Sequence, residues 1–253
     1  MKGPLISIVT PTFNSEKYIK ETISSIFNQT YQNWELLIID DCSLDKTVSY
    51  IKEFSQKDKR VTLFQNEVNS GPAVSRNKGI KAATGDFLTF LDGDDIWFPS
   101  FLENSLNACQ NNNYEFVFAS YRRLDESLQP LLSDFIVPDK VKYQDVLKAC
   151  PIPCLTAFLD IKRIGKYYMP IMNKRQDWGL WLAILKEVDF AYGIQEPLAA
   201  YRMRKDSVSR SKRKLIPYVW QIYREVENFS IIKSSYYFLH WAFNGFKKYY
   251  INR

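Results

Sequence analysis

Three carboxylates stand close together at Asp92-Gly93-Asp94-Asp95, directly after the apolar run Phe87–Leu91. A short apolar run of this kind predicts a buried strand. Carboxylates this close repel one another, and a divalent cation that bridges them to a phosphate relieves the repulsion. We therefore expect a site for a metal and a phosphate at this strand end. The simpler interpretation is a solvated acidic turn.

Two further carboxylates, Asp40 and Asp41, follow the apolar run Trp34–Ile39. One of them can hydrogen-bond a base or a ribose, as acidic residues do in dinucleotide-binding folds; a helix-capping turn is the alternative. The chain has no GxGxxG after its first predicted strand, no P-loop and only nine glycines. Nicotinamide dehydrogenases and Walker-type nucleotide hydrolases are therefore disfavoured.

Alternating strand and helix patterns must position these carboxylates. Ser15 and Asp45 are candidate N-caps of the first two helices. Such alternation implies a parallel sheet covered on both faces, with ligands bound beyond the carboxyl ends of its strands. The predicted strands are Leu5–Thr10, Trp34–Ile39, Val61–Gln65, Asp86–Leu91 and Phe116–Ser120, and the predicted helices are Ser15–Asn28, Asp45–Ser55, Pro72–Ala83 and Pro99–Gln110.

The alternation fades after Tyr121. Residues 121–140 read as a hairpin or a loop excursion, and residues 201–214 as a basic loop. Helices are predicted at Tyr143–Ala149 and Gln176–Lys186, and residues 215–250 read as two amphipathic helices broken near Asn228–Ser230.

Six segments resemble the family 2 glycosyltransferases, and their order and spacing match the family from residue 5 to about residue 210. The resemblance implies a GT-A fold and transfer of a sugar from a nucleoside diphosphate sugar with inversion at the anomeric carbon. The segments are Ile8–Asn14, Ser25–Tyr31, Glu35–Asp41, Gly71–Ile80, Phe90–Asp95 and Gln176–Trp181.

The resemblance also assigns expected roles to single residues. On the nucleotide, Asp41 or its neighbour Asp40 would bind the edge of a uracil-like base, and Asp92 would touch the ribose. Asp94 would hold Mn²⁺ or Mg²⁺ under the diphosphate, with Asp95 as a second ligand. The remaining nucleotide-binding residues are expected to be Pro11, Thr12 and Phe13 near the base and Arg76 from the third helix.

Asp177 is the expected catalytic base, which takes the proton from the acceptor hydroxyl. A helix N-cap is its structural alternative. The family commonly has Glu before this Asp, whereas this chain has Gln176, and that difference concerns acceptor binding. Many relatives carry a histidine near position 204. Arg204 stands there instead, and it can pair with the diphosphate but cannot ligate the cation. Arg202 is a further basic residue expected near the diphosphate.

Composition and targeting signals place the chain among soluble globular proteins. Its 253 residues are 46% hydrophobic and 25% charged. The four cysteines and single histidine make a disulfide framework or a structural zinc site improbable, and reduced cysteines in a cytoplasmic protein are expected. The N-terminus does not read as a signal peptide, and no apolar run is long enough to span a membrane.

Charge is unevenly placed along the chain. Residues 201–253 hold 12 Lys+Arg and 3 Asp+Glu, a net charge of +9, whereas the remainder has a net charge of −3. Basic, aromatic amphipathic helices lie flat on anionic membranes, so we expect peripheral attachment to the inner face of the cell membrane. The alternative is a helix that packs on the catalytic domain or forms a homodimer. No motif indicates nucleic-acid binding.

The sequence thus predicts a glycosyltransferase of bacterial surface-polysaccharide synthesis that uses a UDP-sugar, with dTDP and GDP as alternatives, and a saccharide acceptor that is lipid-linked. Residues 1–120 would bind the nucleotide sugar, 121–214 the acceptor, and 215–253 would form the C-terminal helices. One alternative is a nucleotidyltransferase, although this chain lacks the Gly-rich loop that such an enzyme usually has. The other is a catalytically silent module that binds nucleotide sugars or membranes.

Overall fold

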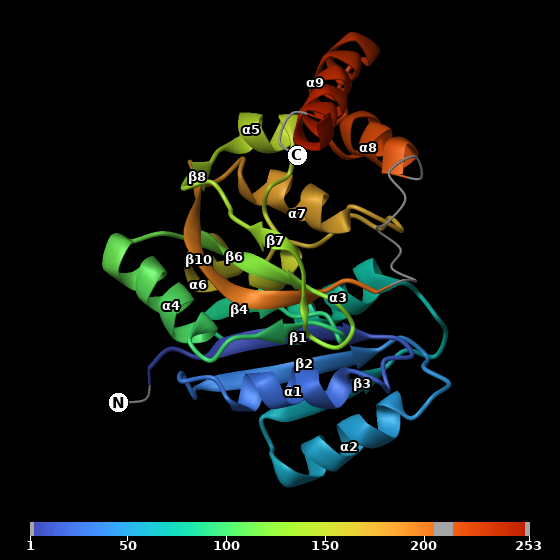
Figure 1. Ribbon diagram of the computed structural model, residues 1–253, viewed down its shortest axis with the longest axis vertical. Coiled ribbons are helices and arrows are strands. Elements are labelled where there is room, and N and C mark those ends of the chain that lie inside the picture. The colour runs from blue at the N-terminus through green and yellow to red at the C-terminus, as the bar shows by residue number, and fades with distance from the viewer. Residues whose placement is uncertain (1–2, 205–214, 251–253) are drawn as a thin grey trace.

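The computed structural model describes residues 3–204 and 215–250, and a mixed sheet lies at its centre (Figure 1). The main path of the sheet runs β3-β2-β1-β4-β9-β6-β10-β5, with β7 beside β6 and β8 beside β10. Strands β3, β2, β1 and β4 are parallel, and so are β6 and β10, whereas β9 lies antiparallel between β4 and β6. Strands β5, β7 and β8 are also antiparallel to their neighbours. The sheet is therefore the α/β sheet that the alternation predicts, with reversed strands added to its parallel ones.

The strands are β1 Ile6–Thr12, β2 Trp34–Asp40, β3 Val61–Gln65, β4 Phe87–Phe90, β5 Ile96–Trp97, β6 Phe116–Leu124, β7 Pro130–Phe135, β8 Lys140–Val141, β9 Phe158–Asp160 and β10 Ala191–Arg202. The helices are α1 Ile19–Phe27, α2 Thr47–Lys57, α3 Pro72–Ala82, α4 Phe101–Asn112, α5 Tyr143–Lys148, α6 Ile161–Ile164, α7 Gln176–Ile184, α8 Ile216–Gln221 and α9 Ile231–Tyr250, with a 3₁₀ turn at Cys154–Thr156 and a π-helical segment, Ile222–Val226, that continues α8.

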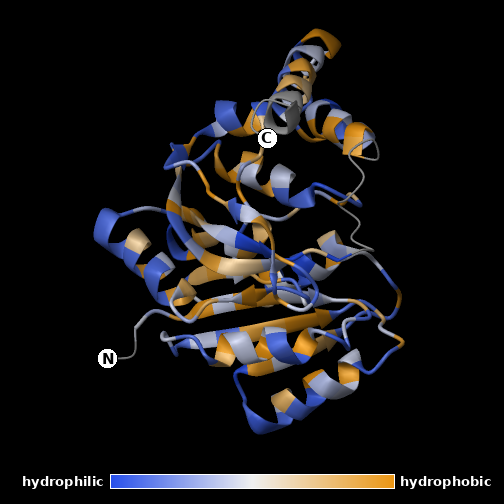
Figure 2. Cartoon of the chain, viewed as in Figure 1, coloured by the Kyte–Doolittle hydropathy of each residue, from blue (hydrophilic) through white to orange (hydrophobic). Residues whose placement is uncertain are grey.

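Both faces of the sheet are covered, which explains why its strands read as continuous apolar runs (Figure 2). Alternate residues of β2 belong to two separate cores. Leu36 and Ile38 pack with α1, whose Ile19, Ile23 and Ile26 are fully buried on one side. Leu37 and Ile39 face the other core, which holds α7 and part of α3. The period-two alternation thus supplies a helix layer on each face.

Helix starts are where the sequence patterns were least informative. Helix α1 begins at Ile19, because residues 16–18 form turns and the Ser15 hydroxyl donates to the Phe13 carbonyl rather than capping the helix. The N-cap of α2 is Lys46, although an Asp45 oxygen does accept the Thr47 N–H at 2.9 Å. Short strands β5, β8 and β9 were not predicted, since two or three residues carry no readable periodicity.

The C-terminal helices separate where the sequence indicated. Asn228 adopts a left-handed backbone conformation (φ 53°) between Ile222–Val226 and α9. The boundary proposed after residue 120 falls inside β6, so the sheet is continuous across it, and the boundary at 214 lies outside the described residues. The predicted basic loop 201–214 is wrong at its start, because Tyr201 and Arg202 belong to β10, and residues 205–214 lie outside the described residues. No helix among the described residues is both long and apolar enough to cross a bilayer.

Candidate active site

The acidic loop 92–95 lies against the end of β1, as the strand-end rule predicts. A Cβ at Gly93 would come within 2.9 Å of Thr12 Cγ2, so only glycine fits this close approach. Thr12 is buried and Phe13, the next residue, exposes 48% of its surface. Pro11 pairs with Ile39 in the parallel β1–β2 ladder. The residues expected near the base therefore lie at the strand ends, beside the acidic loop.

Asp40 and Asp41 are both buried and are used by the protein in different ways. The Asp40 carboxylate accepts hydrogen bonds from Thr12 Oγ1 and from the N–H and hydroxyl of Ser43. Asp41 accepts the N–H of Ser70 at 2.9 Å and of Gly71 at 2.7 Å, so it fixes the loop that begins α3. Asp40 has no exposed surface, whereas Asp41 keeps 5%. The predicted contact with a base stays a prediction, and this burial favours Asp41 for it.

Helix α3 carries Arg76 to the acidic loop. The helix can approach β1 and β2 closely because Gly79 has no side chain: a Cβ there would lie 2.5 Å from Val9 Cγ1. The Arg76 guanidinium, 7% exposed, forms an ion pair with Asp92. Burial opposes its charge, but Asp92 raises its pKa, so Arg76 remains protonated. The predicted convergence of Arg76 and Asp92 is present in the structure.

Asp94 is paired with a basic residue that is far from it in the sequence. Arg204 Nη1 lies 2.9 Å from Asp94 Oδ2, and both side chains are about one-third exposed. Burial raises the pKa of the Asp94 carboxyl, Asp92 raises it further, and the hydrogen bond from Arg204 lowers it. Arg204 thus lies beside the carboxylate expected to hold the cation, and its contact with a diphosphate stays a prediction.

Arg202 and Asp95 form a buried support beneath this pair. Asp95 is 2% exposed, and its Oδ1 accepts the Arg202 N–H at 2.8 Å. Burial raises the pKa of Asp95 well above its ordinary value, with Asp94 and Asp92 adding to the shift. The Arg202 guanidinium donates to the carbonyls of Asp94 and Glu126 and pairs with Glu21. Arg202 is therefore a structural residue rather than a diphosphate ligand, because protein acceptors occupy its guanidinium.

Asp177 lies in the first turn of α7, where its carboxylate is half-buried. The N-cap of that helix is Arg175, and no side chain makes a capping hydrogen bond, so the structural alternative of Asp177 as N-cap is wrong. Burial anchors the helix: Trp178 and Trp181 are 1% and 0% exposed, and Trp178 Nε1 donates to the Val146 carbonyl at 2.9 Å. Helix α7 is apolar nearly all round, so it holds Asp177 on a rigid element.

One cleft of about 870 Å³ is lined by seven of the predicted site residues: Arg76, Asp92, Asp94, Asp95, Asp177, Arg202 and Arg204. Five others do not line it: Pro11, Thr12, Phe13, Asp40 and Asp41. Asp92, Asp94 and Asp95 line this cleft together with Asp177, although loop 92–95 and α7 are more than 80 residues apart in the sequence. The cleft also contains residues without a readable motif: the aromatic rings of Tyr121, Phe135 and Tyr201, the segment 150–155, and residues 173–175. Tyr121 and Phe135 stack with their centroids 5.0 Å apart, which only the β6–β7 pairing could have revealed.

The donor set of loop 92–95 fits a hard divalent cation. Asp92 and Asp94 offer carboxylate oxygens, the ligands that Mg²⁺ and Mn²⁺ prefer, and each side chain is partly exposed to the cleft. Within residues 3–204 and 215–250, no group of three or more His, Cys, Asp or Glu could hold a metal by itself. That composition suits a cation bound by one or two carboxylates together with substrate phosphates.

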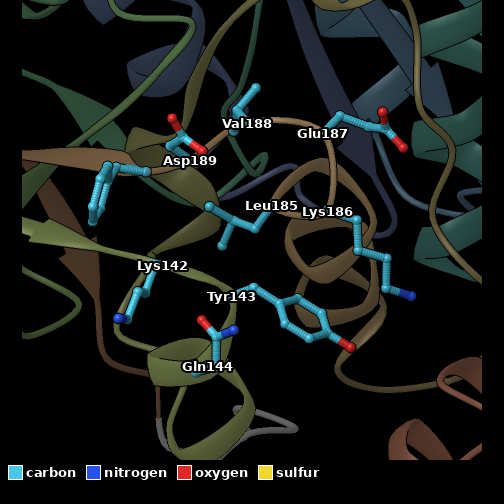
Figure 3. A pocket seen from close by; sticks show the side chains of 9 residues that line it. Lys142, Tyr143, Gln144, Leu185, Lys186, Glu187, Val188 and Asp189 are labelled. Carbon is cyan, nitrogen blue, oxygen red and sulfur yellow. The ribbon is translucent and has the colours of Figure 1, made fainter.

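A second hollow, of about 540 Å³, lies at the opposite end of α7 from Asp177. Figure 3 shows Lys142, Tyr143 and Gln144 facing the segment that follows α7. None of the predicted site residues lines it. Nearby, Tyr143 and Lys186 both bind the buried Glu227 carboxylate, an interaction that fixes the C-terminal helices to the catalytic body.

Comparison with known proteins agrees with the motifs. Residues 7–149 match the family model described as glycosyl transferase family 2. The chain belongs to this family. It is 37% identical over 245 residues to TuaG of Bacillus subtilis, named as a teichuronic acid biosynthesis glycosyltransferase, and the match covers 97% of each chain. It is also 37% identical to WfgD of Escherichia coli, a UDP-Glc:alpha-D-GlcNAc-diphosphoundecaprenol beta-1,3-glucosyltransferase, over 98% of this chain and 96% of WfgD.

Solved structures confirm the GT-A fold that the sequence predicted. Staphylococcus aureus TarS residues 1–349 in complex with UDP-GlcNAc superposes with a TM-score of 0.71 at 17% identity, covering 94% of this chain and 71% of that one. The mannosyltransferase PcManGT from Pyrobaculum calidifontis, in complex with GDP-Man and Mn²⁺, gives a TM-score of 0.68 at 17% identity, covering 93% and 70%.

Proposed function

We propose that this protein is an inverting, metal-dependent glycosyltransferase of surface-polysaccharide synthesis that moves a sugar from a UDP-sugar to a lipid-linked saccharide. The observation that carries the proposal is the single cleft lined by Asp92, Asp94, Arg204 and Asp177. The names of TuaG and WfgD support the pathway and the class of acceptor. The UDP-GlcNAc of the TarS complex and the UDP-Glc in the name of WfgD support UDP, whereas GDP-Man in PcManGT keeps GDP as the alternative.

Each role in the proposed reaction follows from the charge and burial of its residue. Asp177, half-buried on a rigid helix, takes the proton of the acceptor hydroxyl as that oxygen attacks the anomeric carbon. A single displacement needs one base, and this gives inversion. Arg204 and Arg76 are guanidinium groups of the donor side, and Arg204 stabilises negative charge on the leaving diphosphate. A cation held by Asp94 would supply Lewis-acid stabilisation of that diphosphate. Asp95, expected from the sequence as a second ligand, is buried and bonded to the Arg202 N–H, so the partly exposed Asp92 carboxylate is the better second ligand.

A nucleotide panel tests the donor half of this proposal. Thermal unfolding is followed with UDP, GDP, dTDP and CDP, each with and without Mn²⁺, because a ligand that binds only the folded state raises the melting temperature. We expect a rise that is largest for UDP and depends on Mn²⁺. A rise with GDP alone would overturn the choice of UDP. No rise with any nucleotide would favour the catalytically silent module.

Helix α9 supports the proposed attachment to an anionic membrane at the inner face of the cell membrane. Four apolar residues form a stripe along one face of the helix at spacings of four, three and four: Ile232, Tyr236, Leu239 and Phe243. They expose 84%, 52%, 67% and 62% of their surface. The opposite face packs on the core through residues that include Tyr237, Phe238 and Trp241. In Figure 1, α9 projects away from the sheet.

The membrane is the favoured partner for this stripe because the sequence from 201 to 253 carries a net charge of +9 and the relative WfgD acts on a lipid-linked acceptor. Flotation with vesicles containing anionic phosphatidylglycerol tests it. We expect the original protein to float with the vesicles. The stripe variant, which combines Leu239→Gln with Phe243→Gln, should not float. The control Leu44→Gln, at a site on the catalytic body that is 89% exposed, should float like the original protein. The membrane assignment would be overturned if the original protein did not float with the vesicles but formed a homodimer, and the stripe variant were a monomer.

A further inference from the structure

Two consecutive residues of the cleft have buried polar atoms without a partner. Among the described residues, Arg175 Nε and Gln176 Oε1 are shielded from solvent and make no hydrogen bond. Gln176 is 93% buried, with a relative exposure of 7%, and both residues line the cleft. Because a buried polar group without a partner costs free energy, a donor–acceptor pair of this kind at a cleft wall indicates a ligand.

The backbone holds Arg175 in one orientation. It is the N-cap of α7 and adopts a left-handed conformation (φ 63°, ψ 18°), which is uncommon for a residue with a Cβ. Its guanidinium carbon lies 5.9 Å from the ring of Trp178, and that indole is itself fixed by its bond to the Val146 carbonyl. The positive charge is therefore anchored at the end of the helix that carries Asp177.

The segment 150–154 also lines the cleft, with a cysteine at each end. Burial raises the pKa of both thiols, and the charge of Asp177 acts on both of them. Arg76, Asp92 and Asp95 act on Cys154, whereas Arg175 acts on Cys150. Arg175 and Asp177 thus share the cleft with the donor carboxylates, and Arg175 is two residues from the expected base.

We propose that Arg175 and Gln176 form an acceptor subsite, in which Arg175 binds a phosphate of a sugar-diphosphate lipid and Gln176 Oε1 accepts a hydrogen bond from a hydroxyl of its sugar. The proposal rests on the proposed function. In such an acceptor the diphosphate is attached to the sugar ring that carries the attacking hydroxyl. A phosphate-binding group is then needed about one ring from the base, and Arg175 is two residues from Asp177.

The chemistry of the two groups fits that ligand. A guanidinium binds a phosphate with two parallel N–H donors, and the N-terminus of the nine-residue helix α7 adds partial positive charge. In the rest of the cleft, the guanidinium groups of Arg76 and Arg204 are already paired with Asp92 and Asp94, the carboxylates expected at the cation site. The subsite would take anions without a cation, and a uronate carboxylate is the second source of the same charge.

Binding to protein saturated with UDP and Mn²⁺ tests the proposal without requiring turnover. The probes are a short-chain polyprenyl diphosphate, a neutral alkyl N-acetylglucosaminide and an alkyl glucuronide. Arg175→Asn removes the charge while Asn tolerates the left-handed backbone, and Arg175→Lys restores a charge. Arg122→Gln, at a side chain 56% exposed that does not line the cleft, is the matched control.

We expect Arg175→Asn to weaken binding of the polyprenyl diphosphate by about 10- to 100-fold, the range for a charge-assisted hydrogen bond. Arg175→Lys should recover part of the loss, and affinity for UDP and for the neutral N-acetylglucosaminide should not change. Equal binding by Arg175→Asn, or a parallel loss of UDP affinity, would overturn the proposal. A loss confined to the glucuronide would move the subsite to a uronate. Failure of the proposed function would be distinct, since no nucleotide would bind.

Discussion

The packing of α3 on the sheet gives a sharp prediction, because it sets the position of Arg76. A Cβ at Gly79 would lie 2.5 Å from Val9 Cγ1 and 2.8 Å from Ile39 Cδ1. Non-bonded carbons are comfortable at about 3.5–4.0 Å, so the overlap is roughly 1 Å on two sides. Both neighbours are fully buried in strands β1 and β2, which leaves the helix as the element that moves.

Gly79→Ala should therefore lower stability and displace the donor side together. Overpacking of this size costs about 1–3 kcal/mol, and the better helix propensity of alanine offsets up to about 1 kcal/mol. The expected net loss of unfolding free energy is about 1–2 kcal/mol. For a domain of this size that corresponds to a melting temperature roughly 2–8 °C lower. Because Arg76 is one turn away on the same helix, UDP affinity should also fall.

Urea unfolding and UDP thermal shift measure the two effects. Gly245→Ala is the matched control, since the same change on α9 meets no atom within 4 Å and should stabilise slightly. A Gly79→Ala protein as stable as the original, with unchanged UDP affinity, would refute the argument that this close contact sets Arg76.

Three further changes test separate parts of the account. Asp94→Asn should abolish the Mn²⁺ dependence of UDP binding in a thermal-shift titration, and an unchanged dependence would remove Asp94 from the cation site. Arg204→Met should raise the KM for the nucleotide sugar about 10-fold in steady-state kinetics, with little change in urea stability because its pair with Asp94 is partly exposed; an unchanged KM would exclude contact with the diphosphate. The hydrogen bond from Arg60 lowers the pKa of Asp58 below its ordinary value of 3.8, so this pair stabilises the fold above that pH and the benefit is lost as the pH falls below it. Asp58→Asn should accordingly be less stable than the original protein in urea at about pH 6, and the difference in stability should shrink as the pH falls below 3.8. A difference that stays constant over this range would contradict that linkage.

Sequence patterns predicted the nucleotide half of the fold well, for a physical reason. Strands buried on both faces and helices with one apolar face leave strong periodic signals, as at Trp34–Asp40 and Ile19–Phe27. The strand-end rule then brought Asp40, Asp41 and Asp92 to one edge. The convergence of Asp177 with them was implied only by family resemblance, because nothing local in residues 176–181 indicates which edge they approach.

Other features depend on contacts that no short sequence window contains. In the sequence, Arg202 and Arg204 were both basic residues expected near the diphosphate. The partners that occupy the Arg202 guanidinium, Glu21 and Glu126, are about 180 and 76 residues away. The three-residue strand β9 had no periodicity to detect. Arg175 adjoined a recognised motif, and its left-handed backbone and unpartnered Nε are visible only in the fold. Roles that depend on long-range burial were therefore the ones missed.

The most direct test of the central claim is the turnover of Asp177→Asn. The assay follows sugar transfer from the nucleotide sugar that stabilises the protein best, to a sugar-diphosphate lipid acceptor, with UDP binding measured in parallel. Asp189→Asn, a carboxylate in the hollow of Figure 3, is the control and should retain activity. Loss of the base should lower kcat by about 10²- to 10⁴-fold while UDP affinity stays the same. Turnover within a few-fold of the original protein would contradict the assignment of Asp177 as the base.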